Sequence, residues 1–282
     1  MTNSITFFAV VPVRSCGFLM WVNTSCRLEL DYVVATPVIL MLRPRSGAGQ
    51  WVSRETFEFS VPTEVIQHTD QFGNLNQRLT VPADGFVIET TARVNTAKQM
   101  DVGAADPFVP IPELPEDVLQ YLAPSRYCES DRFGPKTLSI AGEETPGYEQ
   151  VARITDWIRE NVAYAPGTSS VPCSASEIEG QGSGVCKDLA HLGIAMCRSI
   201  SIPARFVDGY LLGLEPMDLH AWFEAFVGGR WYAFDPTQRD LSGARVAIAY
   251  GRDAADVAIY HQFGPPARFT DMKVSVAPAT PD

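Results

Sequence analysis

The chain has 282 residues, of which 46% are hydrophobic, 20% are charged and 10% are aromatic. This length and balance predict one large or two smaller folded domains and exclude a disordered or collagen-like chain. With 33 acidic and 22 basic residues the formal net charge is −11, and no run of Lys or Arg interrupts this acidic composition. We therefore expect no nucleic-acid partner.

The amino-terminal segment and the cysteines bear on where the protein works. The apolar stretch 5–13 has no preceding Lys or Arg, contains Pro12 and is followed by Arg14. A second apolar run, 17–22, is much shorter than the roughly 20 residues that cross a bilayer, so we expect no membrane segment. The six cysteines include no CxxC pair and fall below the density of a disulfide scaffold, which favours reduced thiols and a cytoplasmic protein.

Residues 27–95 have the pattern of short strands joined by turns. Segments 28–32 and 56–61 alternate polar and apolar residues, and segment 86–92 is rich in β-branched residues. Clusters of Gly, Asp, Asn and Pro separate these segments. Strands at this spacing predict an antiparallel sandwich or a small barrel, so we assign residues 1–100 to an all-β domain in which residues 1–25 are a possible extension.

The pattern changes after this domain. Prolines at positions 107, 110, 112 and 115 predict an extended connector, and we assign residues 101–115 to a linker. Residues 116–282 form the second expected domain, which opens with helices predicted over 116–123 and 148–162. The second of these helices has a continuous apolar stripe of Val151, Ile154, Trp157, Ile158 and Val162.

A cysteine is predicted at the start of a helix in the second domain. The segment 182–192 begins as a glycine-rich loop and continues with helical spacing, which puts Cys186 at or near the first turn. The unpaired N–H groups and the positive dipole end found there favour an anion such as a thiolate. Gly182 and Gly184 would also let a substrate backbone approach the sulfur closely.

A histidine and an aspartate follow on a predicted hairpin. Segments 218–227 and 230–237 read as strands, and the Gly228-Gly229 connection between them is a strong hairpin signal. His220 lies eight residues before this turn and Asp235 six residues after it, so we expect the imidazole and the carboxylate to meet across the hairpin. Together with Cys186 this pair has the parts for nucleophilic acyl transfer.

Four motifs in this region resemble the bacterial transglutaminase-like superfamily in their order and spacing. The segments Asp70-Gln71-Phe72-Gly73-Asn74 and 250–257 are also similar to parts of such proteins, and the β-rich segment resembles the domain that often precedes the core. The four motifs are Gly184-Val185-Cys186-Lys187-Asp188-Leu189-Ala190-His191, Ile202-Pro203-Ala204-Arg205-Phe206-Val207-Asp208-Gly209-Tyr210, His220-Ala221-Trp222 and Phe234-Asp235-Pro236-Thr237.

This resemblance implies an α+β protein with a papain-like transglutaminase core, in which the helix carrying the cysteine packs on an antiparallel sheet, preceded by an all-β sandwich. It implies that Cys186, His220 and Asp235 form a catalytic triad. Members act as transglutaminases or run the same thioester chemistry toward water as peptidases or amidases. We therefore expect an enzyme that acts on peptide or carboxamide bonds of a peptide or protein substrate, and both outcomes of the thioester stay open.

Three further residues are candidates for substrate or oxyanion contacts, beside the backbone N–H of Cys186. Gln181 could add a side-chain amide in the manner of papain-like enzymes, and Tyr164 resembles the aromatic residue of related enzymes. Trp222 shares the His220 face of its strand and could wall the site or belong to the core. His191 lies about 140° around the helix from Cys186, so we expect it to be structural.

These residue types also occur in metal sites and in binding modules. A zinc site made from Cys173, Cys186, His191 and Cys197 lacks ligand pairs with zinc-like spacing. No acidic loop of EF-hand type is present, so we expect no calcium, no other metal and no cofactor. The competing class is a catalytically silent peptide-binding or scaffold module on the same fold. The sequence does not determine the oligomeric state.

Overall fold

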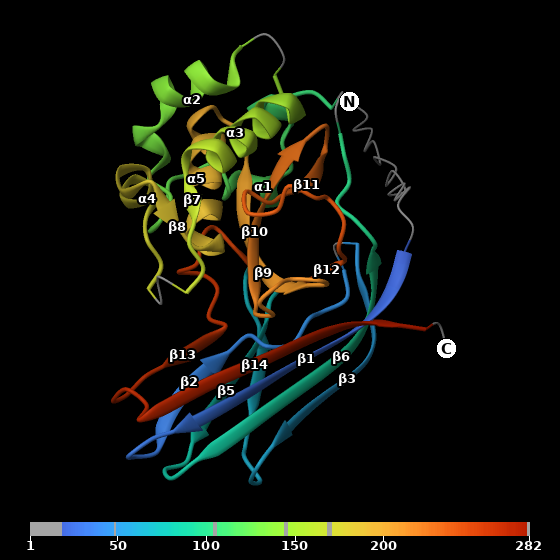
Figure 1. Ribbon diagram of the computed structural model, residues 1–282, viewed down its shortest axis with the longest axis vertical. Coiled ribbons are helices and arrows are strands. Elements are labelled where there is room, and N and C mark those ends of the chain that lie inside the picture. The colour runs from blue at the N-terminus through green and yellow to red at the C-terminus, as the bar shows by residue number, and fades with distance from the viewer. Residues whose placement is uncertain (1–18, 48, 104–105, 144–145, 168–170, 281–282) are drawn as a thin grey trace, which may run out of the picture.

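The computed structural model describes residues 19–47, 49–103, 106–143, 146–167 and 171–280. These residues form two lobes, one made of β-sheets and the other of helices packed on a sheet, so the predicted α+β class is confirmed (Figure 1). The apolar stretch 5–13 and Cys16 lie outside the described residues. None of the helices within the described ranges is long and apolar enough to cross a membrane.

The β lobe is a sandwich of two antiparallel four-stranded sheets. One sheet has the strand order β14-β1-β6-β3, and the other has the order β13-β2-β5-β4. The strands are β1 (Leu19–Asp31), β2 (Thr36–Leu40), β3 (Trp51–Phe59), β4 (Ile66–Thr69), β5 (Leu75–Val81), β6 (Phe86–Ala97), β13 (Tyr260–Gln262) and β14 (Phe269–Ala279).

Alternation of side chains explains why these strands form a sandwich. Every second residue of β1 and β6 is buried, so each strand presents one apolar row to the opposite sheet. Leu28 and Ile88 from one sheet share a buried core with Val38 and Leu40 from the other. The prediction of a sandwich or a barrel is thus resolved as a sandwich.

The chain returns to the β lobe at its carboxyl end, which corrects the expected domain division. Strand β14 pairs with β1 over eleven residues, from Trp21↔Ala279 to Asp31↔Phe269, and β13 pairs with β2. Residues 260–279 therefore complete the amino-terminal sheets, although we assigned them to the second domain. The proposed extension 1–25 also overlaps β1, which begins at Leu19. These pairings connect residues too far apart in sequence for local pattern to reveal.

The second lobe packs helices on the antiparallel sheet β11-β10-β9-β12. Its sheet strands are β9 (Ala204–Leu211), β10 (His220–Val227), β11 (Arg230–Phe234) and β12 (Arg245–Gly251). Its helices are η1 (Ile111–Glu113), α1 (Glu116–Leu119), η2 (Ser130–Arg132), α2 (Gly134–Ala141), α3 (Tyr148–Asn161), α4 (Ala175–Gln181) and α5 (Cys186–Ser199), and two short parallel strands, β7 (Ala163–Tyr164) and β8 (Ser183–Gly184), lie beside them.

Helix α5 lies at the centre of this lobe. Its residues from 188 to 198 are all buried, because α2, α3 and α4 pack around it and the sheet covers its remaining side. Close contact requires Gly193, where a Cβ would come within 2.5 Å of the Phe223 ring on β10. Helix α5 agrees with the predicted helix, whereas α1 ends at Leu119, four residues before the predicted end at 123.

Two amide side chains of the β lobe fasten the free edge of β12. Asn74 donates to the carbonyl of Tyr250 at 2.7 Å and accepts from its N–H at 2.8 Å. Gln50 makes the same pair of bonds with Ala247, both at 2.8 Å. The carboxylate of Asp70 orients Asn74 by accepting hydrogen bonds from the backbone N–H and the side-chain amide of Asn74. The segment 70–74 therefore supplies hydrogen bonds that a further strand would otherwise make, and it joins the two lobes.

Candidate active site

Cys186 is the first residue of α5 and is half-buried. Asp188 fixes the turn that leads into it: one carboxylate oxygen accepts from the Val185 N–H at 3.1 Å and the other from the Cys173 N–H at 2.9 Å. The sulfur thus lies at the positive end of a fourteen-residue helix, as predicted. Asp188 was not predicted, although an acidic residue three positions after the residue that precedes a helix is a known signature of helix starts.

The two glycines before Cys186 have different structural roles. Gly182 has φ +69°, a left-handed conformation, and ends α4. A Cβ at Gly184 would lie 2.8 Å from Cδ1 of Ile178 and 3.0 Å from Cβ of Asp188. Both glycines therefore have a structural reason at the junction of α4 with α5, and the approach of a substrate backbone stays a prediction.

His220 and Asp235 meet across the hairpin, as predicted. His220 begins β10, Asp235 follows the last residue of β11, and Nε2 of the ring lies 2.7 Å from Oδ2 of the carboxylate. Both side chains are fully buried. The strands are in the register Phe223↔Phe234, so the contact crosses the hairpin diagonally. A buried ion pair of this kind fixes which ring nitrogen faces the carboxylate.

The remaining ring nitrogen of His220 is available to Cys186. Nδ1 is buried and makes no complete hydrogen bond with any described residue. Burial alone would lower the pKa of His220, but the hydrogen bond to Asp235 and the nearby Cys186 outweigh burial and raise the pKa to about 9. Because Asp235 occupies Nε2, we place the thiol on the Nδ1 side. Loose thiol–imidazole geometry is common before a substrate binds.

Asp235 has two further partners that sequence reasoning missed. Nη2 of Arg245, at the start of β12, donates to Oδ2 at 2.8 Å, and the backbone N–H and hydroxyl of Thr237 donate to Oδ1 at 3.0 and 2.8 Å. Burial would raise the pKa of Asp235, but the hydrogen bonds from His220 and Arg245 hold it well below its usual range. An isolated arginine at the start of an apolar segment was the only signal for Arg245.

Tyr164 lies beside this cluster, whereas Gln181 is directed elsewhere. Tyr164 on β7 pairs with Gly184, two residues before Cys186. Burial and the nearby Cys186 and Asp235 raise the pKa of Tyr164 to about 12, so its hydroxyl keeps its proton. The exposed side chain of Gln181 donates to the carbonyl of Ser183 at 2.8 Å, so in this structure its amide is used in the local turn.

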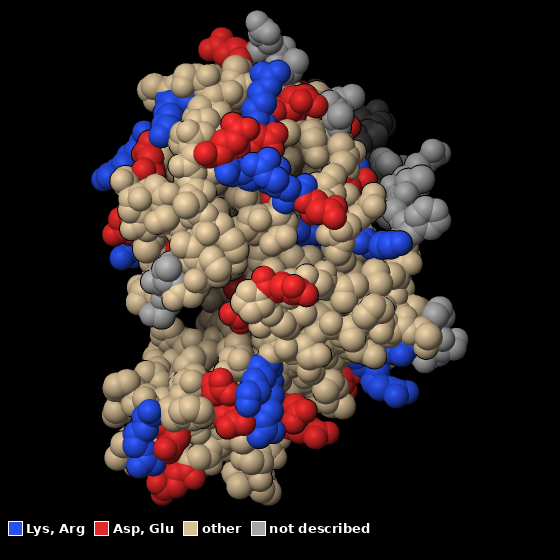
Figure 2. Space-filling view, in the orientation of Figure 1, with Lys and Arg blue, Asp and Glu red and all other residues tan. Residues whose placement is uncertain are grey.

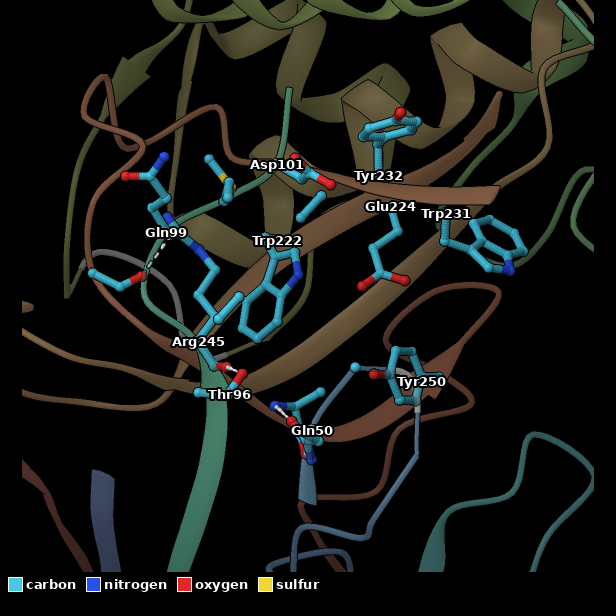
Figure 3. A pocket seen from close by; sticks show the side chains of 16 residues that line it. Gln50, Thr96, Gln99, Asp101, Trp222, Glu224, Trp231, Tyr232, Arg245 and Tyr250 are labelled. Atoms are coloured by element: carbon cyan, nitrogen blue, oxygen red, sulfur yellow. Dashed lines mark hydrogen bonds between the residues drawn. The ribbon is translucent and has the colours of Figure 1, made fainter. Parts of the chain in front are cut away.

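Trp222 lines a cavity on the face of the sheet that is turned away from α5. It is buried, and its ring lies 6.3 Å from that of His220 at an angle of 24°. The cavity holds about 230 Å³ between the two lobes. In Figure 3 Trp222 stands between Arg245 on one side and Glu224 and Tyr250 on the other. Trp222 and Arg245 thus form a wall behind His220 and Asp235.

His191 has the structural role that was expected. Its Nδ1 lies 2.9 Å from the carbonyl of Cys173, and its Nε2 accepts from the Ala254 N–H at 3.1 Å. Burial lowers the pKa of His191, so the ring is neutral, and it stacks on Tyr127 with ring centres 5.1 Å apart. In the part of the chain that the structure describes, no three His, Cys, Asp or Glu side chains gather in a way that could hold a metal ion.

The fold and the site define an α+β protein in which a helix-borne cysteine packs against an antiparallel sheet that carries a His–Asp pair. Comparison with known families agrees: the model of the transglutaminase-like superfamily matches residues 136–236, and the model of the bacterial transglutaminase-like N-terminal region matches residues 31–95. The chain belongs to the transglutaminase-like superfamily, with the bacterial N-terminal region as its β lobe.

Two similar proteins cover most of the chain. A "putative cysteine protease" from Cytophaga hutchinsonii, known from its crystal structure, is 35% identical, with a TM-score of 0.85 over 94% of this chain and 92% of that chain. The uncharacterized protein ML0607 of Mycobacterium leprae is 29% identical over 242 residues, which cover 77% of this chain and 82% of that protein. Both lobes therefore occur together in these relatives.

Proposed function

We propose that the protein is a cysteine-nucleophile acyl-transfer enzyme that acts on peptide or carboxamide bonds of a peptide or protein substrate. The observation that carries this proposal is the fully buried His220–Asp235 pair, whose second ring nitrogen is left for Cys186 at the start of α5. A scaffold or peptide-binding module would not need a buried charged pair oriented toward a half-buried thiol. The "cysteine protease" name of the Cytophaga relative supports the same class.

The proposed reaction has two stages. The Cys186 sulfur, as thiolate beside the His220 imidazolium, attacks the substrate carbonyl and forms a tetrahedral intermediate. His220 then gives its proton to the leaving nitrogen, the C–N bond breaks, and a thioester remains on Cys186. In the second stage His220 takes a proton from water or from an amine, which attacks the thioester and releases an acid or a new amide together with the thiolate.

Two groups are proposed to stabilise the oxyanion. The backbone N–H of Cys186 lies at the helix start, where amides point outward. The Tyr164 hydroxyl is a second donor, because its raised pKa keeps it protonated and it lies beside the thiol. Asp235 would hold the His220 ring with Nδ1 toward the sulfur and stabilise its positive charge, and Arg245 keeps Asp235 ionised.

The first test is the alkylation rate of Cys186 by iodoacetamide between pH 5 and 9, followed by peptide mass spectrometry. We expect rapid labelling at pH 6–7, well below the value of about 8.5 at which an ordinary thiol titrates. In His220→Ala the rate at pH 6.5 should fall about 10- to 100-fold, because no imidazolium then favours the thiolate.

Cys173 is an internal control, since it is also half-buried but its neighbour His191 is neutral and faces its carbonyl. Its labelling should be slow at pH 6.5 in both proteins. Equal rates at Cys186 and Cys173, unchanged by His220→Ala, would refute the acyl-transfer proposal and favour the silent module. If instead Cys186 is activated, a glutamine-containing peptide offered with monodansylcadaverine separates the two reactions. Transfer couples the amine to the peptide, whereas hydrolysis releases ammonia without coupling.

A further inference from the structure

Asp208 lies beside the Cys–His–Asp cluster (Cys186, His220 and Asp235) but is not part of it. In the register of β9 and β10, Asp208 pairs with Ala221 and its neighbour Gly209 pairs with His220. Phe206, two residues earlier, faces α5, since its ring lies 5.3 Å from that of His191. Strand alternation places Asp208 on this same face, the one from which α5 presents Cys186.

The carboxylate of Asp208 lacks the partners that comparable residues have. Its Oδ1 is buried and has no hydrogen-bond partner among the described residues. A buried polar atom without a partner is rare in native proteins and calls for an explanation. Three buried aspartates of this lobe, by contrast, have both oxygens hydrogen-bonded, namely Asp188, Asp235 and Asp253.

The charges that reach Asp208 are those of the active site. Burial raises the pKa of Asp208 to about 7. His220, a backbone hydrogen bond with Gly209 and Lys187 oppose this rise, and the acidic Asp218 adds to it. Figure 2 shows a hollow between the two lobes with Asp and Glu side chains at its edge.

We propose that Asp208 selects substrates by binding a cationic group, an ammonium or a guanidinium, next to the carbonyl that Cys186 attacks. Asp208 as a whole is half-buried, and a cation held near its accessible part would favour the ionised carboxylate. An anionic group would meet a like charge and be rejected. This inference rests on the proposed function, because it names the substrate class of the same site. Asp208 is a specificity-determining residue and takes no proton in the reaction.

The test uses thiol reagents of the same chemistry and different charge. Cys186 is labelled with aminoethyl, methyl and sulfonatoethyl methanethiosulfonate, which are cationic, neutral and anionic, and each rate is divided by that at Cys173 in the same sample. At pH 8, where Asp208 is ionised, we expect the cationic reagent to be strongly preferred to the anionic one. Asp208→Asn should lower this preference about tenfold and leave the neutral reagent unchanged.

Asp218→Asn is the matched control, because it removes the same charge from an exposed side chain and should change the preference no more than about twofold. The role of Asp208 would be overturned if Asp208→Asn left the preference for the cationic reagent intact, or if Asp218→Asn reduced that preference more.

Failure of the proposed function is seen separately, as labelling of Cys186 by the neutral reagent that does not depend on His220. Asp208→Ser, which removes the charge with a smaller side chain, should reproduce the asparagine result.

Discussion

Two carboxylates on the same sheet have opposite surroundings. Around Asp235 the chain supplies an imidazole, a guanidinium and a threonine, so the carboxylate is ionised and fixed. Around Asp208 the residues that the structure describes supply no partner for Oδ1, and burial raises the pKa to about 7. The difference teaches that the fold supplies partners for Asp235, which orients His220. It leaves Asp208 without a countercharge of its own, in the place where we propose that the substrate binds.

Replacing Asp235 would remove the first half of this contrast. In Asp235→Asn, His220 and Arg245 stay buried without their anion, so we expect the free energy of unfolding to fall by about 3–5 kcal/mol. Labelling of Cys186 at pH 6.5 should slow at least about tenfold, because the imidazolium is no longer stabilised. Urea unfolding and the alkylation assay measure the two effects.

The surface variant Asp156→Asn is the control for this experiment. It loses an ion pair with Arg159 in which the aspartate side chain is 65% exposed, and pairs of this kind contribute less than about 1 kcal/mol. An Asp235→Asn protein as stable as this control would mean that the buried pair does not stabilise the lobe.

The pH dependence of stability tests the ion pair between His220 and Asp235. Folding raises the pKa of His220 from 6.5 to about 9, so the folded protein holds a proton that the unfolded chain releases over this range. The raised pKa of His220 contributes about 3 kcal/mol to the free energy of unfolding. This contribution is fully present below pH 6.5 and is lost as the pH rises through 9. Urea unfolding at several pH values should show this decline. His220→Gln should flatten it, and an equal decline in that variant would assign it to other groups.

Asp208→Asn tests the opposite side of the comparison and should be stabilising. Folding raises the pKa of Asp208 from 3.8 to about 7, so ionising this carboxylate costs stability above pH 3.8, and fully so above pH 7. We expect the variant to gain about 1–2 kcal/mol at pH 8, less than the roughly 4 kcal/mol of the full shift because the asparagine amide is also partly desolvated, and to match the wild type near pH 3.5. Thermal or urea unfolding at the two pH values measures the gain, and a loss of stability at pH 8 would show that Asp208 has a structural partner.

Local sequence patterns determined the two parts of the candidate site separately. The helix that begins at Cys186 and the hairpin that joins His220 to Asp235 both follow from short-range signals, a glycine-rich helix start and a two-glycine turn. The buried role of His191 followed from helical periodicity. These features could be predicted because each depends on residues within about fifteen positions of one another.

Contacts between distant segments were decided only by the tertiary structure. Side-chain packing brings α5 to β10 and thereby Cys186 to His220, and the order of the strands brings Arg245 on β12 to Asp235. The pairing of β14 with β1 likewise joins the two ends of the chain. Local periodicity shows which face of a segment is buried and not what covers it, so the partners of Asp235, and the missing partner of Asp208, emerge only when all the elements are packed together.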